Sequence, residues 1–392
     1  MSGALDGLLV VELGSTIAGP FCARLLADFG ARVIKVEDPR GDTLRSMGAQ
    51  VEGHSLYAAS LLRNKDVVSI DMRRPAGRDA VRRLIARSDI VVENFRPGAM
   101  EGWGLDYPSL AARNPGLIMV RISGFGQTGP YSARVGYGVI GEAVSGLRSI
   151  IGDPDRPPSR VGTPVTDYVT GLYAAFGALA AVAERQRSGR GQLVDAALSE
   201  CAFSLMESFV PAYARLGIVP VRAGSRLPGA APNNLYLARD GKHVHIAAFG
   251  DPVFRRLCAT IGAPQLAADP RFANGQARAD ESEALDAIVG AWVARHEAAE
   301  VERLLTAADV PAARIFSLPE IFDNEHFKAR GMLVRTEDPQ IGEVTLAAPV
   351  PILSRTPARV RHAGRPVGAD TRAILAEVAG LAKEEIDALE AD

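Results

Sequence analysis

The sequence has few residues of the kinds that staple secreted proteins or bind metal ions. Its only cysteines are Cys22, Cys201 and Cys258, which are far apart and form no CxxC pair. An odd number of isolated cysteines argues against a disulfide framework, and the missing CxxC spacing argues against a zinc site. We therefore expect reduced, buried thiols in a cytoplasmic protein, and no bound metal.

Excess charge and long apolar runs are also missing. The 44 Lys and Arg residues nearly balance the 46 Asp and Glu residues, which leaves a net charge of −2. Such a chain does not indicate binding to nucleic acid or to an acidic membrane surface. No basic segment followed by an apolar run opens the chain, and no segment approaches about 18 uninterrupted apolar residues, so no membrane span is predicted. Lysine is rare too, and its only positions are Lys35, Lys65, Lys242, Lys328 and Lys383.

What is present is typical of a globular enzyme. The 392 residues are 47% hydrophobic and 23% charged, a length that suits about two domains. Short apolar strands alternate with helical patterns in the first half, with helices expected over 21–29 and 77–88. The expected strands are 8–13, 32–37, 66–70, 89–94 and 117–122. This alternation predicts an α/β fold with a doubly wound parallel sheet, in which ligands bind at the carboxyl ends of the strands.

A glycine pattern after one strand suggests a dinucleotide site but does not fit it. Gly124-Phe-Gly-Gln-Thr-Gly129 matches G-x-G-x-x-G, yet Pro130-Tyr-Ser follows where the fingerprint needs a helix. The pattern also follows a late strand rather than the first one. An NAD-dependent dehydrogenase is therefore only an alternative interpretation.

Changes in residue composition in the second half of the chain suggest where the domains divide. The stretch from Pro211 to Pro232 is rich in loop residues, with Gly224-Ser-Arg-Leu-Pro-Gly229 at its centre. We expect a large domain over 1–210 and a smaller α/β domain over 225–325. A strand at 243–247 and helices at 254–261 and 281–309, the latter divided near Ala298, belong to the smaller one. His243 and His245 share a strand face, but no third metal ligand accompanies them.

One carboxylate stands at the start of a long apolar helix. The chain up to Asp167 reads as extended, and a helix follows that ends at Ser188-Gly189. Leu172, Phe176, Leu179 and Ala183 recur at helical spacing, so we expect this helix to be buried. Asp167 is explained by simple helix capping, or by a functional carboxylate that the helix dipole keeps charged.

Several stretches together resemble the class III CoA-transferases, which include formyl-CoA and carnitine CoA-transferases and the 2-methylacyl-CoA racemases. The matches run in order through the first half and continue to the C-terminus. They are Ala18-Gly-Pro20, Asp28-Phe-Gly-Ala-Arg-Val-Ile-Lys-Val-Glu37, Gly41-Asp-Thr-Leu-Arg45, Arg63-Asn-Lys65, Val92-Glu-Asn-Phe-Arg-Pro-Gly98, Ser123-Gly-Phe-Gly-Gln-Thr-Gly-Pro-Tyr131, Gly136-Tyr137, Asp167, Thr170-Gly171 and Ser188-Gly-Arg-Gly-Gln192.

The resemblance implies a fold, a partner and a site. It implies a large Rossmann-like domain that binds coenzyme A (CoA), a C-terminal segment (330–392) that returns to it, and an interlocked homodimer. Asp167 matches the family nucleophile, and Tyr137 matches a tyrosine beside the reacting thioester. The positions implied for CoA contacts are Ile17, Ala18, Ile70, Asp71, Met72, Arg73, Asn94, Phe95 and Arg96.

The positions at which this sequence departs from the resembled family narrow the range of expected substrates. Formyl-CoA transferases have an arginine where this chain has Asp38, so Arg40 or Arg45 is expected to supply nucleotide contacts. Their closing glycine loop is absent, with Gly224–Gly229 as the nearest substitute, which argues against formate and oxalate chemistry. The racemases have a histidine where this chain has Tyr137, which removes one of two proton-transfer groups.

These residues predict CoA transfer between an acyl-CoA and a carboxylic acid, without a metal or a further cofactor. Asp167 would form a mixed anhydride and then an aspartyl-CoA thioester. Succinyl-CoA or another short dicarboxylyl-CoA is the expected donor, with Arg148 or Arg226 as a candidate clamp for a second carboxylate. A 2-methylacyl-CoA racemase remains the nearest alternative, and a CoA-binding protein without catalysis is another.

Overall fold

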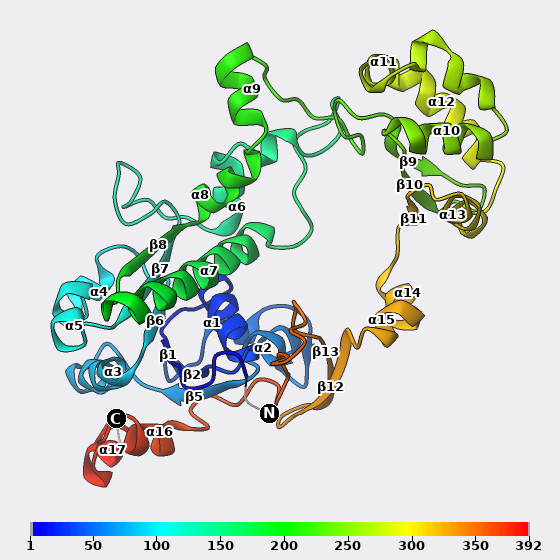
Figure 1. Cartoon of the computed structure of the whole chain (residues 1–392). Coiled ribbons are helices and arrows are strands. Elements are labelled where there is room, and N and C mark those ends of the chain that lie inside the picture. Colours follow the sequence, from blue (N-terminus) through cyan, green and yellow to red (C-terminus); the bar gives the residue numbers. More distant parts are fainter. Residues whose placement is uncertain (1–2, 391–392) are drawn as a thin grey trace. The chain divides into compact units, whose positions relative to one another are not determined.

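A six-stranded parallel sheet forms the centre of the larger of two units in the computed structural model, which describes residues 3–390 (Figure 1). Its strand order is β5-β2-β1-β6-β7-β8, and every neighbouring pair is parallel. The chain adds β2 and β5 on one side of β1, and then β6, β7 and β8 on the other side. Open α/β sheets bind ligands at the position where the strand order reverses, which here lies between β1 and β6. The strands are β1 Leu9–Glu12, β2 Arg32–Glu37, β5 Lys65–Ser69, β6 Ile90–Glu93, β7 Ile118–Ser123 and β8 Leu193–Ala197.

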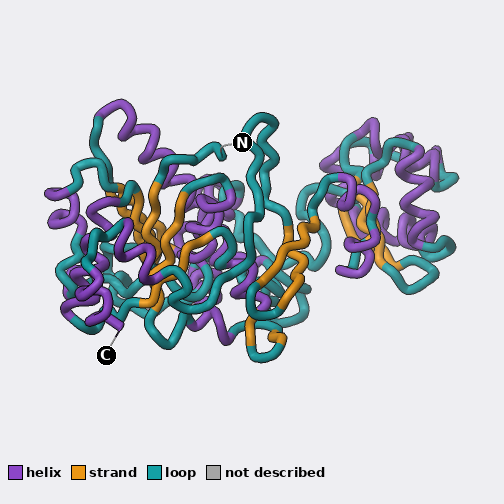
Figure 2. The backbone as a smooth tube through the Cα atoms, turned by 90° about the horizontal axis from the view of Figure 1, so that it is seen from below, coloured by secondary structure: helices purple, strands orange, loops and turns teal. Residues whose placement is uncertain are grey.

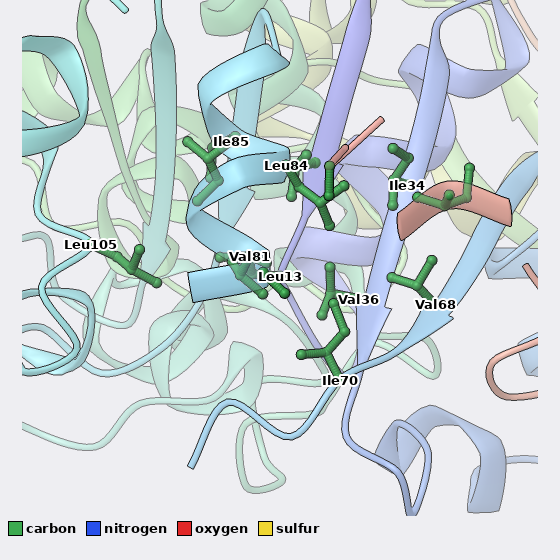
Figure 3. Packing of buried hydrophobic residues seen from close by; sticks show 14 of the residues in the cluster. Leu13, Ile34, Val36, Val68, Ile70, Val81, Leu84, Ile85 and Leu105 are labelled. Atoms are coloured by element: carbon green, nitrogen blue, oxygen red, sulfur yellow. The ribbon is translucent and has the colours of Figure 1, made fainter. Parts of the chain in front are cut away.

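One face of this sheet is covered by helices from both ends of the chain. These are α3 Pro75–Arg87, α5 Tyr107–Arg113, α16 Thr371–Glu377 and α17 Lys383–Glu390. Val36 and Val68 of the strands pack with Val81 and Leu84 of α3 in a buried cluster (Figure 3). Each such side chain contributes about 1.5–3 kcal/mol by leaving water. Residues 371–390 therefore help to complete the core that the first half begins.

The opposite face packs on α1 (Ala18–Asp28) and α7 (Val165–Ser188). The two helices approach closely because the positions between them are small. A Cβ atom at Gly171 would lie 2.8 Å from the carbonyl oxygen of Ala18 and 2.9 Å from a ring carbon of Phe21. Glycine at this position brings the backbone of α7 directly against α1.

The structure corrects two expectations about α7. The helix begins at Val165 after Pro164, so Asp167 lies inside the first turn and is not the capping residue. Its small side chains Ala174, Ala178 and Ala181 are buried, whereas Leu172 and Phe176 are 57% and 69% exposed. The close packing on α1 favours the small face, which leaves the large apolar side chains outside. The predicted end is correct, because Gly189 caps the helix with φ 73°.

By length and composition alone, α7 is apolar enough to cross a membrane, since its best window has a mean hydropathy of 1.3. However, 44% of that window is buried against the rest of the protein. A single helix of this kind is weak evidence for a membrane span, since core helices of globular proteins pass the same test of length and composition.

The remaining elements of the larger unit are short. They are β3 Gln50–Val51, β4 His54–Ser55, α2 Leu56–Leu61, α4 Ala99–Gly102, α6 Gly138–Val144, α8 Leu198–Phe203, α9 Phe209–Leu216, α15 Glu325–Ala329, β12 Leu333–Asp338 and β13 Gly342–Ala347. The α9 helix occupies the start of a stretch expected to be loop, and none of its residues is buried. The prediction of a loop from Pro211 onwards is wrong for α9. The helix accommodates Pro211 because this residue lies within its first turn.

The smaller unit is built on an antiparallel sheet of order β11-β10-β9 with helices packed against it (Figure 2). Its core joins Val244 and Ile246 of β10 to Phe254, Leu257 and Val289 of the helices. Its elements are β9 Asn233–Leu237, β10 His243–Ala247, α10 Asp251–Thr260, α11 Gly275–Asp280, α12 Ser282–Val293, α13 Ala298–Ala307, β11 Ala312–Arg314 and α14 Leu318–Asp323.

Chain contacts define the boundaries of the two units. The larger unit comprises Met1–Leu147, Val161–Gly217 and Glu325–Asp392, and the smaller comprises Arg148–Arg160 and Ile218–Asn324. The expected ranges of 1–210 and 225–325 place residues 148–160 in the large domain, whereas here they group with the smaller unit. Within the smaller unit, the backbone amide of Gly224 donates to the carbonyl of Gly152 and so joins its two segments. Such a long-range contact leaves no signal in local sequence.

Candidate active site

Asp167 lies in the wall of a cavity of about 490 Å³ within the larger unit. We call this the Asp167 cavity. Its other walls come from the loops that follow β1, β6 and β7, where parallel strands present their carboxyl ends. Of the residues expected from sequence, the cavity brings together Ile17, Ala18, Asn94, Phe95, Arg96, Tyr137 and Asp167.

The carboxylate of Asp167 rests against the first residue of α6. A Cβ atom at Gly138 would lie only 1.8 Å from Asp167 Oδ2 and 2.7 Å from its carboxyl carbon. Glycine at residue 138 is thus what allows the nucleophile candidate to occupy its place. Tyr137, immediately before, is 67% exposed and is therefore not a core aromatic residue.

Aromatic side chains hold the turn of α7 that carries Asp167. The hydroxyls of Tyr57 and Tyr168 lie 2.6 Å apart, and the Tyr168 ring packs on Phe21 with centroids 4.8 Å apart. Burial raises the pKa of Tyr57, and the Tyr168 hydroxyl and the charge of Asp167 add to this rise. The residue next to Asp167 is thereby fixed to α1 and α2.

Asn94 lines the cavity but its amide is engaged by the protein. Asn94 Oδ1 accepts from the Ser15 amide at 2.7 Å, and Asn94 Nδ2 donates to the Ser15 carbonyl at 2.8 Å. The side chain therefore joins the loop after β6 to the loop after β1. Its position matches a CoA contact of the resembled family, and the geometry gives it a structural task at that position.

Two arginines supply positive charge to the Asp167 cavity. Arg96 and Arg134 line it. The guanidinium of Arg134 stacks on Tyr131, 3.5 Å from its ring centroid, and Tyr131 meets Phe125 edge-on. The aromatic residues of the Ser123–Tyr131 motif thus support a cation at the cavity.

The two arginines suggested from sequence as a carboxylate clamp belong to the smaller unit. Arg226 donates from Nε to Asp286 Oδ2 at 2.7 Å, and Asp286 also accepts from Asn234 and Tyr236. This pairing anchors the Gly224–Gly229 loop to α12. Arg148 lies at the start of the same unit and does not line the Asp167 cavity.

A second cavity of about 290 Å³ lies at the carboxyl ends of β2 and β5. We call it the strand-end cavity. It is lined by the predicted residues Ile70, Asp71, Met72 and Arg73, and it shares Ser15, Thr43 and Phe95 with the Asp167 cavity. Arg40 pairs with Asp38 and Arg73 with Asp71, so the pKa of each carboxyl lies below its usual value. The arginines are mostly exposed and can reorient towards a ligand.

Arg45 does not line either cavity. Its guanidinium donates to both oxygens of the buried Glu37, at 2.8 and 2.9 Å, and to the carbonyl of Arg365. The Arg63-Asn-Lys65 motif is likewise part of the core. Arg63 forms a bidentate pair with Asp28, and Lys65 Nζ lies 2.6 Å from Glu12 Oε2.

The region that the structure describes contains no group of three or more His, Cys, Asp or Glu residues placed to hold a metal ion. The Gly124–Gly129 stretch is a loop, and α6 opens only at Gly138, so the dinucleotide fingerprint is incomplete. Gly124 instead packs against Gly136, where a Cβ atom would lie 2.9 Å from the Gly136 Cα.

Sequence reasoning missed three residues that shape the site, Gly138, Arg134 and Thr16. Gly136-Tyr137-Gly138 signals a turn, but the need for glycine at 138 depends on where α7 places Asp167. Arg134 sits in a polar stretch without periodicity, so nothing local distinguishes it. The backbone of Thr16 has φ 68°, which residue type alone would not suggest.

Comparison with known proteins shows the family of this chain. The model of the CoA-transferase family III matches residues 5–371. The succinyl-CoA–D-citramalate CoA-transferase of Chloroflexus aurantiacus is 45% identical, over 99% of this chain and 97% of that protein. The alpha subunit of the succinyl-CoA–L-malate CoA-transferase from Chloroflexus aurantiacus is 39% identical, over 98% and 91%. The succinate–glutarate CoA-transferase of Agrobacterium fabrum is 36% identical, over 95% of each chain.

A solved structure has the same fold. The crystal structure of a CAIB/BAIF family protein from Brucella suis matches with a TM-score of 0.85 and 36% identity. The match covers 96% of this chain and all of that one.

Proposed function

Because the chain belongs to CoA-transferase family III, we propose that it moves CoA from succinyl-CoA to a small dicarboxylic acid. The single observation that carries the chemistry is the Asp167 carboxylate, half-buried in a cavity and placed against Gly138. The substrate class rests on the relatives, whose names pair succinyl-CoA with citramalate or malate and succinate with glutarate.

The proposed reaction uses Asp167 as a nucleophile. Its carboxylate attacks the thioester carbon, the carbon–sulfur bond breaks, and CoA leaves as a thiolate. The resulting mixed anhydride is attacked at the aspartyl carbon by the thiolate, which releases succinate and leaves an aspartyl-CoA thioester. The acceptor carboxylate then repeats the two steps in reverse order. Holding both partners beside Asp167 contributes about 7–11 kcal/mol through effective concentration.

The nucleotide and the acyl group are assigned to different cavities of the Rossmann-like large domain. The strand-end cavity, with Ile70–Arg73 in its wall, suits the nucleotide of CoA, whose phosphates would draw Arg40 and Arg73 from their carboxylates. The Asp167 cavity suits the thioester and the acid. Arg96 and Arg134 are its candidate cations for phosphate or carboxylate, and they replace Arg148 and Arg226 in that role.

A homodimer, interlocked as the resemblance implies, is part of the proposal. The exposed face of α7 includes Leu172, Tyr173 and Phe176, and α9 exposes Tyr213 and Leu216. Large exposed apolar side chains gathered on one helix face favour an interface. Three unpaired thiols suit a reducing cytoplasm, where we place the enzyme.

Intact-protein mass spectrometry tests the function. Incubation with succinyl-CoA should add a succinyl or CoA mass, and hydroxylamine or borohydride trapping should place it on the Asp167 peptide. Asp167→Asn, with nearly the same shape, should show neither the adduct nor CoA exchange into citramalate, malate or glutarate. A wild-type protein that washes deuterium into the α-carbon of a 2-methylacyl-CoA without exchanging CoA would be a racemase instead.

A further inference from the structure

Thr16 has an unusual backbone for its residue type. It lies in the wall of the Asp167 cavity with φ 68°, and of the positive-φ non-glycine residues described it is the one with a β-branched side chain. A branched Cβ crowds the backbone in this region, so the conformation is unfavourable on its own. Such a conformation persists only where surrounding contacts enforce it.

Side chains from three other elements enforce it. The Thr16 amide donates to Asp42 Oδ1 at 3.0 Å, and Asn94 bonds to both polar groups of the Ser15 backbone. Lys35 Nζ donates to the carbonyl of Gly14. Each of residues 14–16 is therefore held by a side chain remote in sequence.

Asp42 is itself fixed by a buried charge. Its Oδ2 lies 2.7 Å from Lys35 Nζ, and both side chains are 1% exposed. Its Oδ1 accepts from the amide of Leu44 as well as from Thr16. With one oxygen committed to Lys35 and the other to two amides, the carboxylate cannot rotate without leaving a buried group unpaired.

We propose that Asp42, held by Lys35, is a positioning residue for CoA transfer, because it fixes the strained Thr16 in the wall that sets the thioester against Asp167. The inference rests on the proposed function and extends it to Asp42 and Lys35, which line the strand-end cavity and not the Asp167 cavity. Without Asp42, Thr16 relaxes to negative φ, and the adjoining Ile17 and Ala18 move with it.

The variant Asp42→Asn tests this role. An amide has one acceptor oxygen, so asparagine must give up either Lys35 or the amides of Thr16 and Leu44. Lys35 retains Glu12 at 3.2 Å, which favours a folded protein. We expect the rate of covalent adduct formation on Asp167, measured by rapid-quench mass spectrometry with succinyl-CoA, to fall by at least about ten-fold.

A second substitution separates positioning from general structural damage. Glycine adopts φ near 68° without strain, so Thr16→Gly should restore most of the rate in the Asp42→Asn background. The matched control is Asp28→Asn, which breaks the buried pair with Arg63, also 1% exposed, away from the site. It should lower stability without changing the adduct rate, and Thr16→Gly should not affect that loss of stability.

The outcomes are distinct. Asp42→Asn reacting at the wild-type rate, or no recovery on adding Thr16→Gly, overturns the inference. If Asp42→Asn yields too little folded protein, Thr16→Gly is compared with Thr16→Gly/Asp42→Asn. If these two variants form the adduct at rates within about twofold of each other, positioning through Thr16 is supported. If the double variant is slower by about ten-fold, positioning through Thr16 is contradicted. A wild-type protein that forms no adduct removes the proposed function instead.

Discussion

Gly138 and Asp167 fit together so closely that the smallest side chain at residue 138 would occupy the place of the carboxylate. The hypothetical Cβ lies 1.8 Å from Asp167 Oδ2. The obstructed atom is the end of a rotatable side chain, so the fold can adjust by turning Asp167 aside. We therefore expect Gly138→Ala to leave the melting temperature nearly unchanged and to lower transferase turnover by about 100-fold.

Gly162→Ala is the control for that substitution. Residue 162 lies just before α7, the helix that carries Asp167, and a Cβ there would meet nothing within 4 Å. Turnover should stay near the wild-type value. Normal turnover in Gly138→Ala would mean that Asp167 reacts from another rotamer than the one in the structure.

Packing between α1 and α7 gives a prediction about stability. In Gly171→Ala the new methyl group would lie 2.8 Å from the backbone oxygen of Ala18, which cannot move without shifting α1. We expect a loss of about 1–3 kcal/mol in the free energy of unfolding, measured by urea titration. Gly102→Ala, in a helix with free space around it, should be neutral or slightly stabilising. Equal stabilities would show that the two helices are not in tight contact.

The sequence predicted the sheet well and the faces of α7 poorly. Each of the first five strands was placed within about two residues, because an all-parallel sheet buries continuous apolar runs that are visible locally. The large side chains of α7 were expected inside and lie outside. Periodicity locates an apolar face but does not say whether its own fold or another chain covers it. Gly138, Thr16 and Asp42 acquire their roles only through contacts between remote segments.

The exposed face of α7 predicts association. Phe176 is 69% exposed at its centre, and replacing it by glutamate would place a charge in the proposed interface. We expect Phe176→Glu to shift the molar mass from dimer to monomer in light scattering coupled to gel filtration. Arg187→Glu, at an 80% exposed side chain near the end of the same helix, should leave the mass unchanged. A dimer that survives Phe176→Glu would use another surface.

The Asp42 carboxyl predicts sensitivity to acid. Burial by itself would raise its pKa, but Lys35 and the amides of Leu44 and Thr16 outweigh burial and lower the pKa. A lowered pKa in the folded state means that the unfolded chain binds the proton more readily. The stabilisation is complete above the unfolded value of about 3.9 and is lost as pH falls through the lower folded value. Unfolding free energies measured from about pH 6 to about pH 3 should fall more steeply for wild type than for Asp42→Asn, and parallel curves would contradict this.

The thiols are expected to be inert in the folded protein. Burial, with the nearby Glu12 charge, raises the pKa of Cys22 to about 12, and burial raises that of Cys258 to about 11. Thiolates react with aromatic disulfides, and thiols do not. At pH near 7, labelling of Cys22 and Cys258 should therefore occur only when a denaturant unfolds the chain. Rapid labelling of Cys22 in native buffer would indicate local opening between α1 and the sheet.

Lys35 and Lys65 are both fully buried and ion-paired, and this has a consequence for chemical self-damage. Free amines also attack activated acyl groups, so a CoA-transferase works beside reagents that can modify its own lysines. The buried pair is shielded, and the raised pKa of Lys35 reflects the carboxylates that offset its burial and keep it protonated. Only Lys242, Lys328 and Lys383 present their amines to solvent, two of them beside carboxylates. The scarcity of lysine thus leaves few targets for stray acylation, and none of these three lines the Asp167 cavity.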